Sequence, residues 1–203
     1  MHEIKNSGKS LKEAKKVAIL LHGRGASAES ILSLADHLSL QDFALFAPQA
    51  PGHTWYPYSF MAPDEANAAD LKRAIEIIDE LVNQLHAEGF AYDQIYFIGF
   101  SQGACLSLEY ASLNAKKYGG VIAFTGGLIG EKLVHNKYSG DFGQTPVFIG
   151  CSHKDIHVPL QRVQESAALM EQLGANVNTM IFQDTHHTIR EEEVDWVNKN
   201  ILS

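Results

Sequence analysis

The feature that most constrains the fold is an alternation of short, unbroken apolar runs with longer segments of helical periodicity. An apolar run without polar alternation is typical of a strand buried on both faces of a parallel sheet. The expected strands are residues 17–21, 43–47, 95–98, 121–124, 147–149 and 177–182. The expected helices are residues 30–40, 67–85, 104–110, 160–173 and 191–202. This order predicts an α/β fold with a mainly parallel central sheet, flanked by helices and joined by right-handed crossovers.

Composition narrows the class of protein. At 203 residues with 45% apolar and 20% charged residues, the chain has the size and composition of one globular domain, so a disordered or coiled-coil chain is excluded. We expect a single domain over residues 1–203, beginning with a polar segment, residues 1–16. A formal charge of −8 without any basic cluster argues against a nucleic-acid partner.

The cysteine count and the hydropathy of the chain suggest where it works. Cys105 and Cys151 are too few for a disulfide framework. Residues 1–16 carry no apolar signal region, and no apolar run reaches the roughly 18 residues that a membrane span needs. We therefore expect a reduced, soluble, cytoplasmic protein without a stable membrane anchor.

The clearest chemical motif is Gly99-Phe100-Ser101-Gln102-Gly103, a G-x-S-x-G pattern between an expected strand and an expected helix. In a nucleophile elbow the serine occupies a tight strand-to-helix turn with an exposed hydroxyl, and the glycines let neighbouring chain pass closely. The helix N-terminus also places amides near a developing anion. A chance match in an ordinary turn is the alternative, but the position at the carboxyl end of a strand favours a catalytic Ser101.

A nucleophilic serine needs a base, and the base needs an acid that orients it. Asp155 follows the expected strand 147–149, and both His186 and His187 follow the last strand, so the order serine, acid, histidine of α/β-hydrolases is present. Asp155 could instead be a capping or turn residue. Asp184 is the competing acid, but it lies on the same loop as the histidines and is better explained as a turn residue.

An oxyanion hole needs two amide donors. One is expected from Gln102, the residue after the serine, and the other from Arg24 in the segment His22-Gly23-Arg24-Gly25, which follows the first expected strand. His22 is expected to hold this loop by hydrogen bonding. An ordinary His-Gly turn is the alternative reading.

Five segments together resemble one known family: LHGRG at 21–25, GFSQGA at 99–104, TGGLIG at 125–130, DIHVP at 155–159 and HHTI at 186–189. They are similar to the phospholipase/carboxylesterase family, a small cytosolic branch of the α/β-hydrolases that includes acyl-protein thioesterases. The resemblance implies an α/β-hydrolase fold without a separate cap domain, a shallow apolar groove, and activity on esters, thioesters or lysophospholipids without a cofactor. In this pattern Ser101 matches the nucleophile, Asp155 the acid and His187 the base.

The chain departs from the family pattern at three places. His186 replaces a glycine, Cys151-Ser152 replaces a His-Gly pair before the acid, and Thr125 replaces a serine.

Several histidines lie near the expected site, so a metal centre was considered. His153, Asp155 and His157 alternate along one loop, but Pro159 and the turn context break a regular ligand spacing. The chain holds no H-E-x-x-H motif and no paired C-x-x-C motif. We expect no metal and no cofactor. Cys105, one helical turn after Ser101, is expected to pack within its helix and not to act as a second nucleophile.

The segment 52–63 is rich in aromatic residues and follows a strand end, so it is expected to line the substrate pocket, although core filling is the alternative. The residues expected to bind substrate are Trp55, Tyr56, Phe60 and Met61, with Leu128 and Ile129 at the same mouth. Because bulky aromatic residues in a short loop suggest a short groove, we expect a small- or medium-chain acyl optimum.

Together these features predict a serine hydrolase that cleaves carboxylic esters or thioesters of short or medium acyl chains through an acyl-enzyme. A lysophospholipase or an acyl-protein thioesterase is the alternative within the class, and an acyltransferase would need an acceptor site that the sequence does not reveal. A dienelactone-hydrolase-like enzyme would normally carry cysteine at position 101. A non-catalytic binding protein with this fold should lack a triad member, and none is missing. The expected partner is a small-molecule substrate, and a homodimer stays open.

Overall fold

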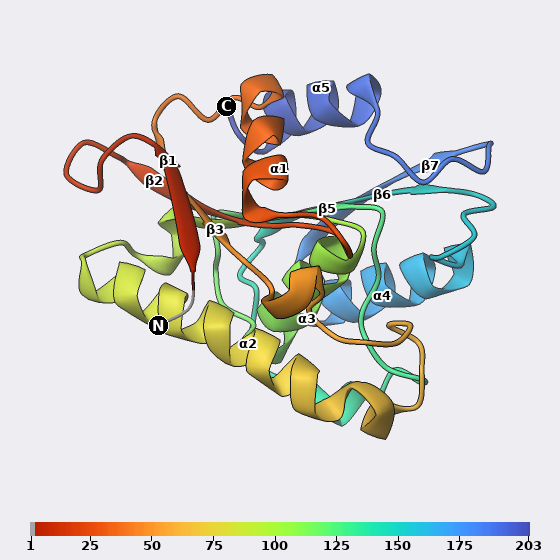
Figure 1. Cartoon of the computed structure of the whole chain (residues 1–203). Coiled ribbons are helices and arrows are strands. Elements are labelled where there is room, and N and C mark those ends of the chain that lie inside the picture. The colour runs from red at the N-terminus through yellow and green to blue at the C-terminus, as the bar shows by residue number, and fades with distance from the viewer. Residues whose placement is uncertain (1–2) are drawn as a thin grey trace.

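The computed structural model describes residues 3–203 and is built around one seven-stranded sheet in the order β1-β3-β2-β4-β5-β6-β7 (Figure 1). The strands are β1 (Ile4–Gly8), β2 (Lys16–Leu21), β3 (Phe43–Pro48), β4 (Ile95–Phe100), β5 (Gly120–Phe124), β6 (Pro146–Ser152) and β7 (Asn176–Phe182). The pairings from β3 to β7 are parallel. The predicted α/β-hydrolase architecture is therefore confirmed, and all six predicted strands are present.

The first strand lies within the segment that the sequence analysis described only as polar, and it was not predicted. Ile4–Gly8 pairs antiparallel with β3, with Ile4 opposite Pro48 and Gly8 opposite Ala44. This segment has neither an apolar run nor a regular alternation, because a short edge strand is held by its backbone pairing and keeps polar side chains in water. Local pattern therefore could not reveal it.

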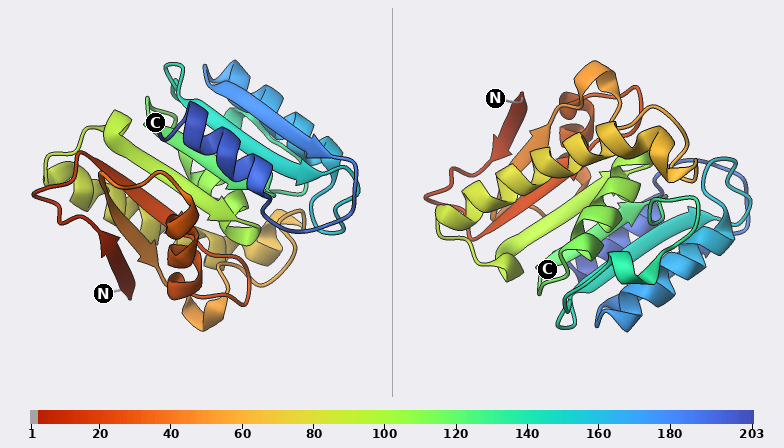
Figure 2. Two further views of the ribbon diagram at one scale, coloured as in Figure 1. Left: turned by 90° about the horizontal axis from the view of Figure 1, so that it is seen from above. Right: turned by 90° about the horizontal axis from the view of Figure 1, so that it is seen from below.

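Helices cover both faces of the sheet. They are α1 (Ala28–Leu32), α2 (Asp64–Ala87), α3 (Gln102–Leu113), α4 (Leu160–Gln172) and α5 (Glu191–Asn200). In Figures 1 and 2, α1 and α5 lie on one face and α2, α3 and α4 on the other. The predicted helix 30–40 begins earlier, at Ala28, and changes after Leu32 to a 3-10 turn, Ser33–His37. No helix within residues 3–203 combines the length and the hydropathy needed to cross a membrane.

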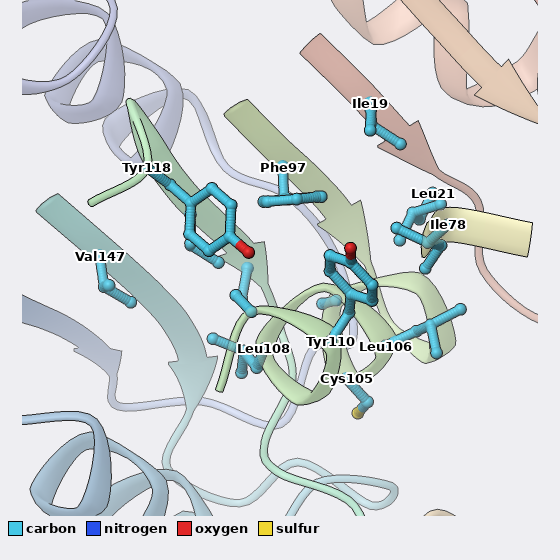
Figure 3. Close-up of a cluster of buried hydrophobic side chains, with 14 of the residues drawn as sticks. Ile19, Leu21, Ile78, Phe97, Cys105, Leu106, Leu108, Tyr110, Tyr118 and Val147 are labelled. Atoms are coloured by element: carbon cyan, nitrogen blue, oxygen red, sulfur yellow. The ribbon is translucent and has the colours of Figure 1, made fainter. Parts of the chain in front are cut away.

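The central strands divide their side chains between two apolar clusters. Ile19 and Phe97 point to the cluster under α2, α3 and α4, whereas Leu20 and Ile98 point to the cluster on the other face. This two-sided burial explains the unbroken apolar runs in the sequence. Figure 3 shows α3 packed into the larger cluster, where its side chains meet residues of several strands.

Helix α3 is buried along almost its whole length, from Gln102 to Ser112. A helix buried on all sides is fixed by packing in every direction. Its N-terminus begins directly after Ser101, at the carboxyl end of β4. The loops that follow β2, β6 and β7 begin at the same edge of the sheet as Ser101, because these strands run parallel to β4.

Candidate active site

Ser101 forms a sharp turn between β4 and α3. Its backbone has φ 55° and ψ −117°, a conformation that an L-residue adopts only when the surrounding structure imposes it. A Cβ atom on Gly99 would lie 2.3 Å from the Gly103 carbonyl oxygen, and one on Gly103 would lie 2.0 Å from the Leu21 carbonyl oxygen. Both glycines of the motif are therefore required by close backbone contacts, and they hold Ser101 in its strained conformation.

Two hydrogen bonds join Ser101 to a histidine and a carboxylate. The Ser101 hydroxyl donates to Nε2 of His187 at 2.8 Å, and Nδ1 of His187 donates to Oδ2 of Asp155 at 2.8 Å. The other carboxylate oxygen, Oδ1, accepts the backbone amides of His157 and Val158 at 2.8 and 2.9 Å. The aspartate fixes the imidazole tautomer, so that Nε2 is free to accept the serine proton.

The competing acid and histidine lie outside this chain of hydrogen bonds. The His186 side chain is 75% exposed. Asp184 accepts hydrogen bonds from the His186 amide, the Ser152 hydroxyl and the Arg190 guanidinium. The His186 and Ser152 hydrogen bonds, with Arg190 nearby, hold the pKa of the Asp184 carboxyl below its ordinary value. The structure therefore brings together Ser101, Asp155 and His187, and leaves Asp184 in the adjoining turn.

Two backbone amides beside Ser101 have no hydrogen-bond partner within residues 3–203: those of Arg24 and Gln102. Both residues line the same cleft as Ser101. The first-turn amides of a helix have no partner inside the helix, so the Gln102 amide is free to bind an anion. This is the arrangement that an oxyanion hole requires.

His22 supports the loop that carries Arg24. Its Nδ1 donates to the Gly23 carbonyl at 2.7 Å, and its Nε2 accepts the Ala50 amide at 3.1 Å. Burial lowers the pKa of His22, which keeps the ring neutral and preserves this pattern of one donor and one acceptor. As predicted from the sequence, His22 lies behind the loop and holds it by hydrogen bonding.

The side chains of Arg24 and Gln102 fasten the aromatic segment to the site. Gln102 accepts the Trp55 amide through Oε1 at 2.9 Å and donates through Nε2 to the Tyr56 carbonyl at 2.8 Å. The Arg24 guanidinium donates to the carbonyls of Pro57 and Tyr58 at 2.7 and 2.6 Å. Each residue thus combines an unpartnered backbone amide with a side chain that positions the cleft wall.

A cleft of about 650 Å³ opens beside Ser101. Its apolar wall includes Tyr56, Phe60, Phe100 and Val158, while His157 and His187 form part of its polar side. Sequence reasoning missed Phe100, Val158 and His157, which lie at or after the carboxyl ends of β4 and β6, on the same edge of the sheet. The Phe100 and His157 rings lie 5.3 and 4.9 Å from the His187 ring, measured between centroids.

Four of the residues expected to bind substrate do not line this cleft. Trp55 is 2% exposed, and its indole nitrogen donates to the His22 carbonyl at 2.9 Å, so it packs beneath the wall. Met61 faces a separate depression beside α4. Leu128 and Ile129 are buried, because their amides bond to Ser166 and Glu109 and turn this loop inward. Of the predicted set, Tyr56 and Phe60 remain in the wall.

Two further kinds of reactive group were considered beside Ser101 in the sequence: metal ligands and the thiol of Cys105. No group of three or more His, Cys, Asp or Glu side chains within residues 3–203 is placed to hold a metal ion. Cys105 reaches the floor of the cleft, but burial raises the pKa of its thiol to about 12. It therefore stays protonated and is a poor nucleophile at neutral pH.

Comparisons with known proteins extend over the whole fold. Residues 3–202 match the family model described as Phospholipase/Carboxylesterase. The crystal structure of a phospholipase/carboxylesterase from Dyadobacter fermentans is 49% identical and superposes with a TM-score of 0.98, covering 100% of this chain and 97% of that one. A probable carboxylesterase SOBER1-like from Arabidopsis thaliana is 23% identical over 91% of this chain and 77% of its own length. Acyl-protein thioesterase 1 of Yarrowia lipolytica is 24% identical, covering 90% of this chain and 91% of the relative.

Proposed function

Because the chain belongs to the phospholipase/carboxylesterase family, we propose that it hydrolyses carboxylic esters or thioesters through an acyl-enzyme on Ser101. The membership confirms the resemblance seen in the sequence, and it agrees with a hydrolase that acts on esters or thioesters. One observation carries the proposal of mechanism: the unbroken chain of two 2.8 Å hydrogen bonds from Ser101 through His187 to Asp155, at the mouth of a cleft.

The reaction begins when the Ser101 oxygen attacks the substrate carbonyl carbon and Nε2 of His187 takes the hydroxyl proton. The carbonyl oxygen becomes an anion, which the amides of Arg24 and Gln102 stabilise. Asp155 stabilises the imidazolium through its hydrogen bond to Nδ1. His187 then gives its proton to the departing alcohol or thiol as the carbon–oxygen or carbon–sulfur bond breaks.

Deacylation repeats these steps with water. His187 takes a proton from a water molecule that attacks the acyl carbon, and then returns a proton to the Ser101 oxygen as the acid leaves. The same two amides serve the second anion. No further group is needed to balance the reaction.

The cleft suggests the size of the acyl group. The apolar wall of Tyr56, Phe60 and Val158 can bury the methylenes of a short or medium chain, and we expect the bulky rings to end the groove there. Each buried methylene contributes about 0.8 kcal/mol, close to a fourfold gain in kcat/KM. We therefore propose that the preference rises from acetyl towards butyryl or hexanoyl and then falls.

The names of the relatives favour a second candidate within the same chemistry. The name of acyl-protein thioesterase 1 of Yarrowia lipolytica suggests an acyl-protein thioester as substrate, and the family description suggests a phospholipid ester. We keep the small ester as the main proposal, because we expect the bulky rings in the cleft wall to limit the acyl length.

The test compares p-nitrophenyl esters of graded chain length with an acyl-CoA thioester, and uses Ser101→Ala as the control. Ser101→Ala should lower kcat by roughly 10⁴-fold or more while leaving the fold intact. A fluorophosphonate probe should label the wild type and not this variant. Labelling that persists in Ser101→Ala would assign the nucleophile elsewhere, and a folded wild type that neither hydrolyses nor labels would favour a non-catalytic binding protein.

A further inference from the structure

Two places where the sequence departs from the family pattern, Ser152 and His186, lie against each other in the structure. The Ser152 hydroxyl bonds to the backbone carbonyl of His186, the residue directly before the proposed base. We propose that Ser152 and Arg190 are positioning residues, which hold the segment 183–190, here named the histidine loop, so that His187 stays aligned with Ser101. The inference rests on the proposed function, since it concerns the same base.

The histidine loop lacks a backbone framework of its own. Within residues 3–203, none of the amides from Thr185 to Ile189 donates to a backbone carbonyl. The His186 amide bonds instead to the Asp184 carboxylate at 2.9 Å. Loops held in this way depend on side chains for their conformation, because no ladder of backbone bonds restricts them.

Ser152 lies at the end of β6 and is fully buried. Its one hydroxyl proton lies between two acceptors, Oδ1 of Asp184 at 2.7 Å and the His186 carbonyl. The segment carrying the acid adds two backbone bonds, from the His153 amide to the Phe182 carbonyl and from the Lys154 amide to the Asp184 carbonyl. The loop of the acid and the loop of the base are therefore joined at Ser152.

Arg190 closes the network from the other side. Its Nη2 lies 2.7 Å from both the Ser152 hydroxyl and Oδ1 of Asp184, and 3.3 Å from the His186 carbonyl. Its guanidinium also lies over the Phe182 ring, 4.1 Å from the centroid. One planar cation thus contacts both ends of the segment that carries His187, with only 11% of its side chain exposed.

Arg190 is itself anchored in α5. Its backbone amide donates to Oε2 of Glu193 at 2.8 Å. The Glu193 carboxylate is completely buried and lies against Gly150, where a Cβ atom would collide with it. The network therefore connects the first turn of α5 to the end of β6, on either side of the histidine loop.

The consequence for catalysis is geometric. Displacement of a catalytic group by about 1 Å can cost a hundredfold in rate. Loss of the Arg190 contacts should leave the apolar wall of the cleft, Tyr56, Phe60 and Val158, unchanged, since none of these residues belongs to the network. Arg190→Met should therefore lower kcat and the rate of fluorophosphonate labelling by roughly ten- to a hundredfold, with KM changed by less than about threefold.

The experiment uses three single variants, the double variant of Arg190→Met and Ser152→Ala, and a matched control. Arg190→Lys should recover part of the lost rate, since an ammonium can still donate to Ser152 and the His186 carbonyl. Ser152→Ala should lower kcat less than Arg190→Met, and the double variant should be no slower than roughly the worse single variant, because both act on one carbonyl. Arg73→Met, which removes an exposed arginine bonded to Asp70 on α2, should have no effect.

Each outcome is decisive. Folded Arg190→Met and Ser152→Ala with wild-type kcat and labelling rate would overturn the inference and leave the proposed function standing. Effects that multiply in the double variant would also overturn it. If Arg190→Met does not fold, Ser152→Ala and Arg190→Lys decide the question. A wild type that neither hydrolyses esters nor labels would instead overturn the proposed function, and the inference with it.

Discussion

The proposed nucleophile and the proposed base are held in place by different physical means. Ser101 lies between a buried strand and a buried helix, where Gly99 and Gly103 leave no space for a side-chain atom. His187 lies on a half-exposed loop whose backbone is fixed by the side chains of Ser152 and Arg190. One half of the site is thus secured by steric exclusion and the other by polar contacts.

This difference predicts two kinds of response to substitution. Close backbone packing fails abruptly, because an added atom has nowhere to go. A network of hydrogen bonds loses its members one at a time, and each loss costs a limited amount. The elbow should therefore show all-or-none effects, whereas the histidine loop should show graded ones.

The largest expected effect is that of Gly103→Ala in the elbow. Alanine normally stabilises a helix position relative to glycine by about 1 kcal/mol, so a loss here isolates the steric contact with Leu21. We expect destabilisation of more than about 4 kcal/mol, measured by urea unfolding, with activity lost in parallel. A folded and active Gly103→Ala protein would show that the elbow is as adaptable as the loop.

The next effect separates the two adjacent histidines. His187→Ala should lower kcat/KM by roughly 10⁴-fold, because the triad acts as a unit. His186→Ala should lower it by about tenfold or less, since its exposed side chain touches none of the triad and only its backbone carbonyl is used in the network. Steady-state kinetics with a p-nitrophenyl ester measures both, and the reverse ranking would move the role of base to His186.

The third effect is a pH dependence of the free energy of unfolding that arises from Glu193, next to the histidine loop. Burial raises the pKa of Glu193 from its ordinary 4.5 to about 7. Its contribution to stability is present below pH 4.5 and is lost as the pH rises through 7, because the buried carboxylate must then ionise. As the pH rises from 4.5 to 8, the free energy of unfolding of Glu193→Gln should therefore increase by roughly 2 to 3 kcal/mol relative to that of the wild type.

Urea unfolding at several pH values measures this difference. Glu191→Gln, on the exposed side of the same helix, is the matched control and should show no such gain. A wild type and a Glu193→Gln variant whose stabilities run parallel with pH would show that Glu193 is already ionised in the folded protein.

The smallest effect concerns the two free thiols, one on each side of the site. Cys105 lies in α3 and Cys151 directly precedes Ser152, and burial raises the pKa of both thiols to about 12. Both should resist a disulfide reagent at pH 8 until the protein opens locally. We expect Cys151 to react a fewfold faster than Cys105, because the polar contacts around Ser152 should open more readily than the packing of α3. The Cys105→Ala variant reports the rate of Cys151, and the Cys151→Ala variant reports the rate of Cys105. Equal rates would mean that the two sides open together.

Most of the fold could be predicted, because the central strands carry a local signal. A strand such as Lys16–Leu21 is apolar on both faces, and this is visible without knowledge of its neighbours. The edge strand Ile4–Gly8 has no such signal, since its stability comes from pairing with β3, a contact between distant parts of the chain. Burial on both faces thus makes a strand recognisable, and exposure at an edge hides it.

The candidate site also has a part that the sequence predicts and a part that it does not. The elbow was visible because five consecutive residues carry its pattern, although the contact that requires Gly103 is with Leu21 on another strand. The aromatic wall was only partly predicted, because composition cannot tell which ring faces outward. Trp55 turns inward to donate to the His22 carbonyl, while Tyr56, the next residue, reaches the cleft. The contacts of Arg190 with Ser152 were out of reach, because they join residues that lie far apart in the chain.

Arg24 and Gln102 give the site a capacity for evolutionary change. Every residue except proline has a backbone amide, so the proposed anion-binding function does not specify which side chain these positions carry. Their side chains, in contrast, hold the segment Thr54–Tyr58 through its amides and carbonyls. A codon change at either position can therefore reshape the acyl pocket while it leaves the amide donor in the peptide chain. In a lineage with this arrangement, the preferred acyl chain can therefore change while the rate of catalysis is kept. Libraries randomised at residues 24 and 102 should accordingly yield active enzymes with altered chain-length profiles.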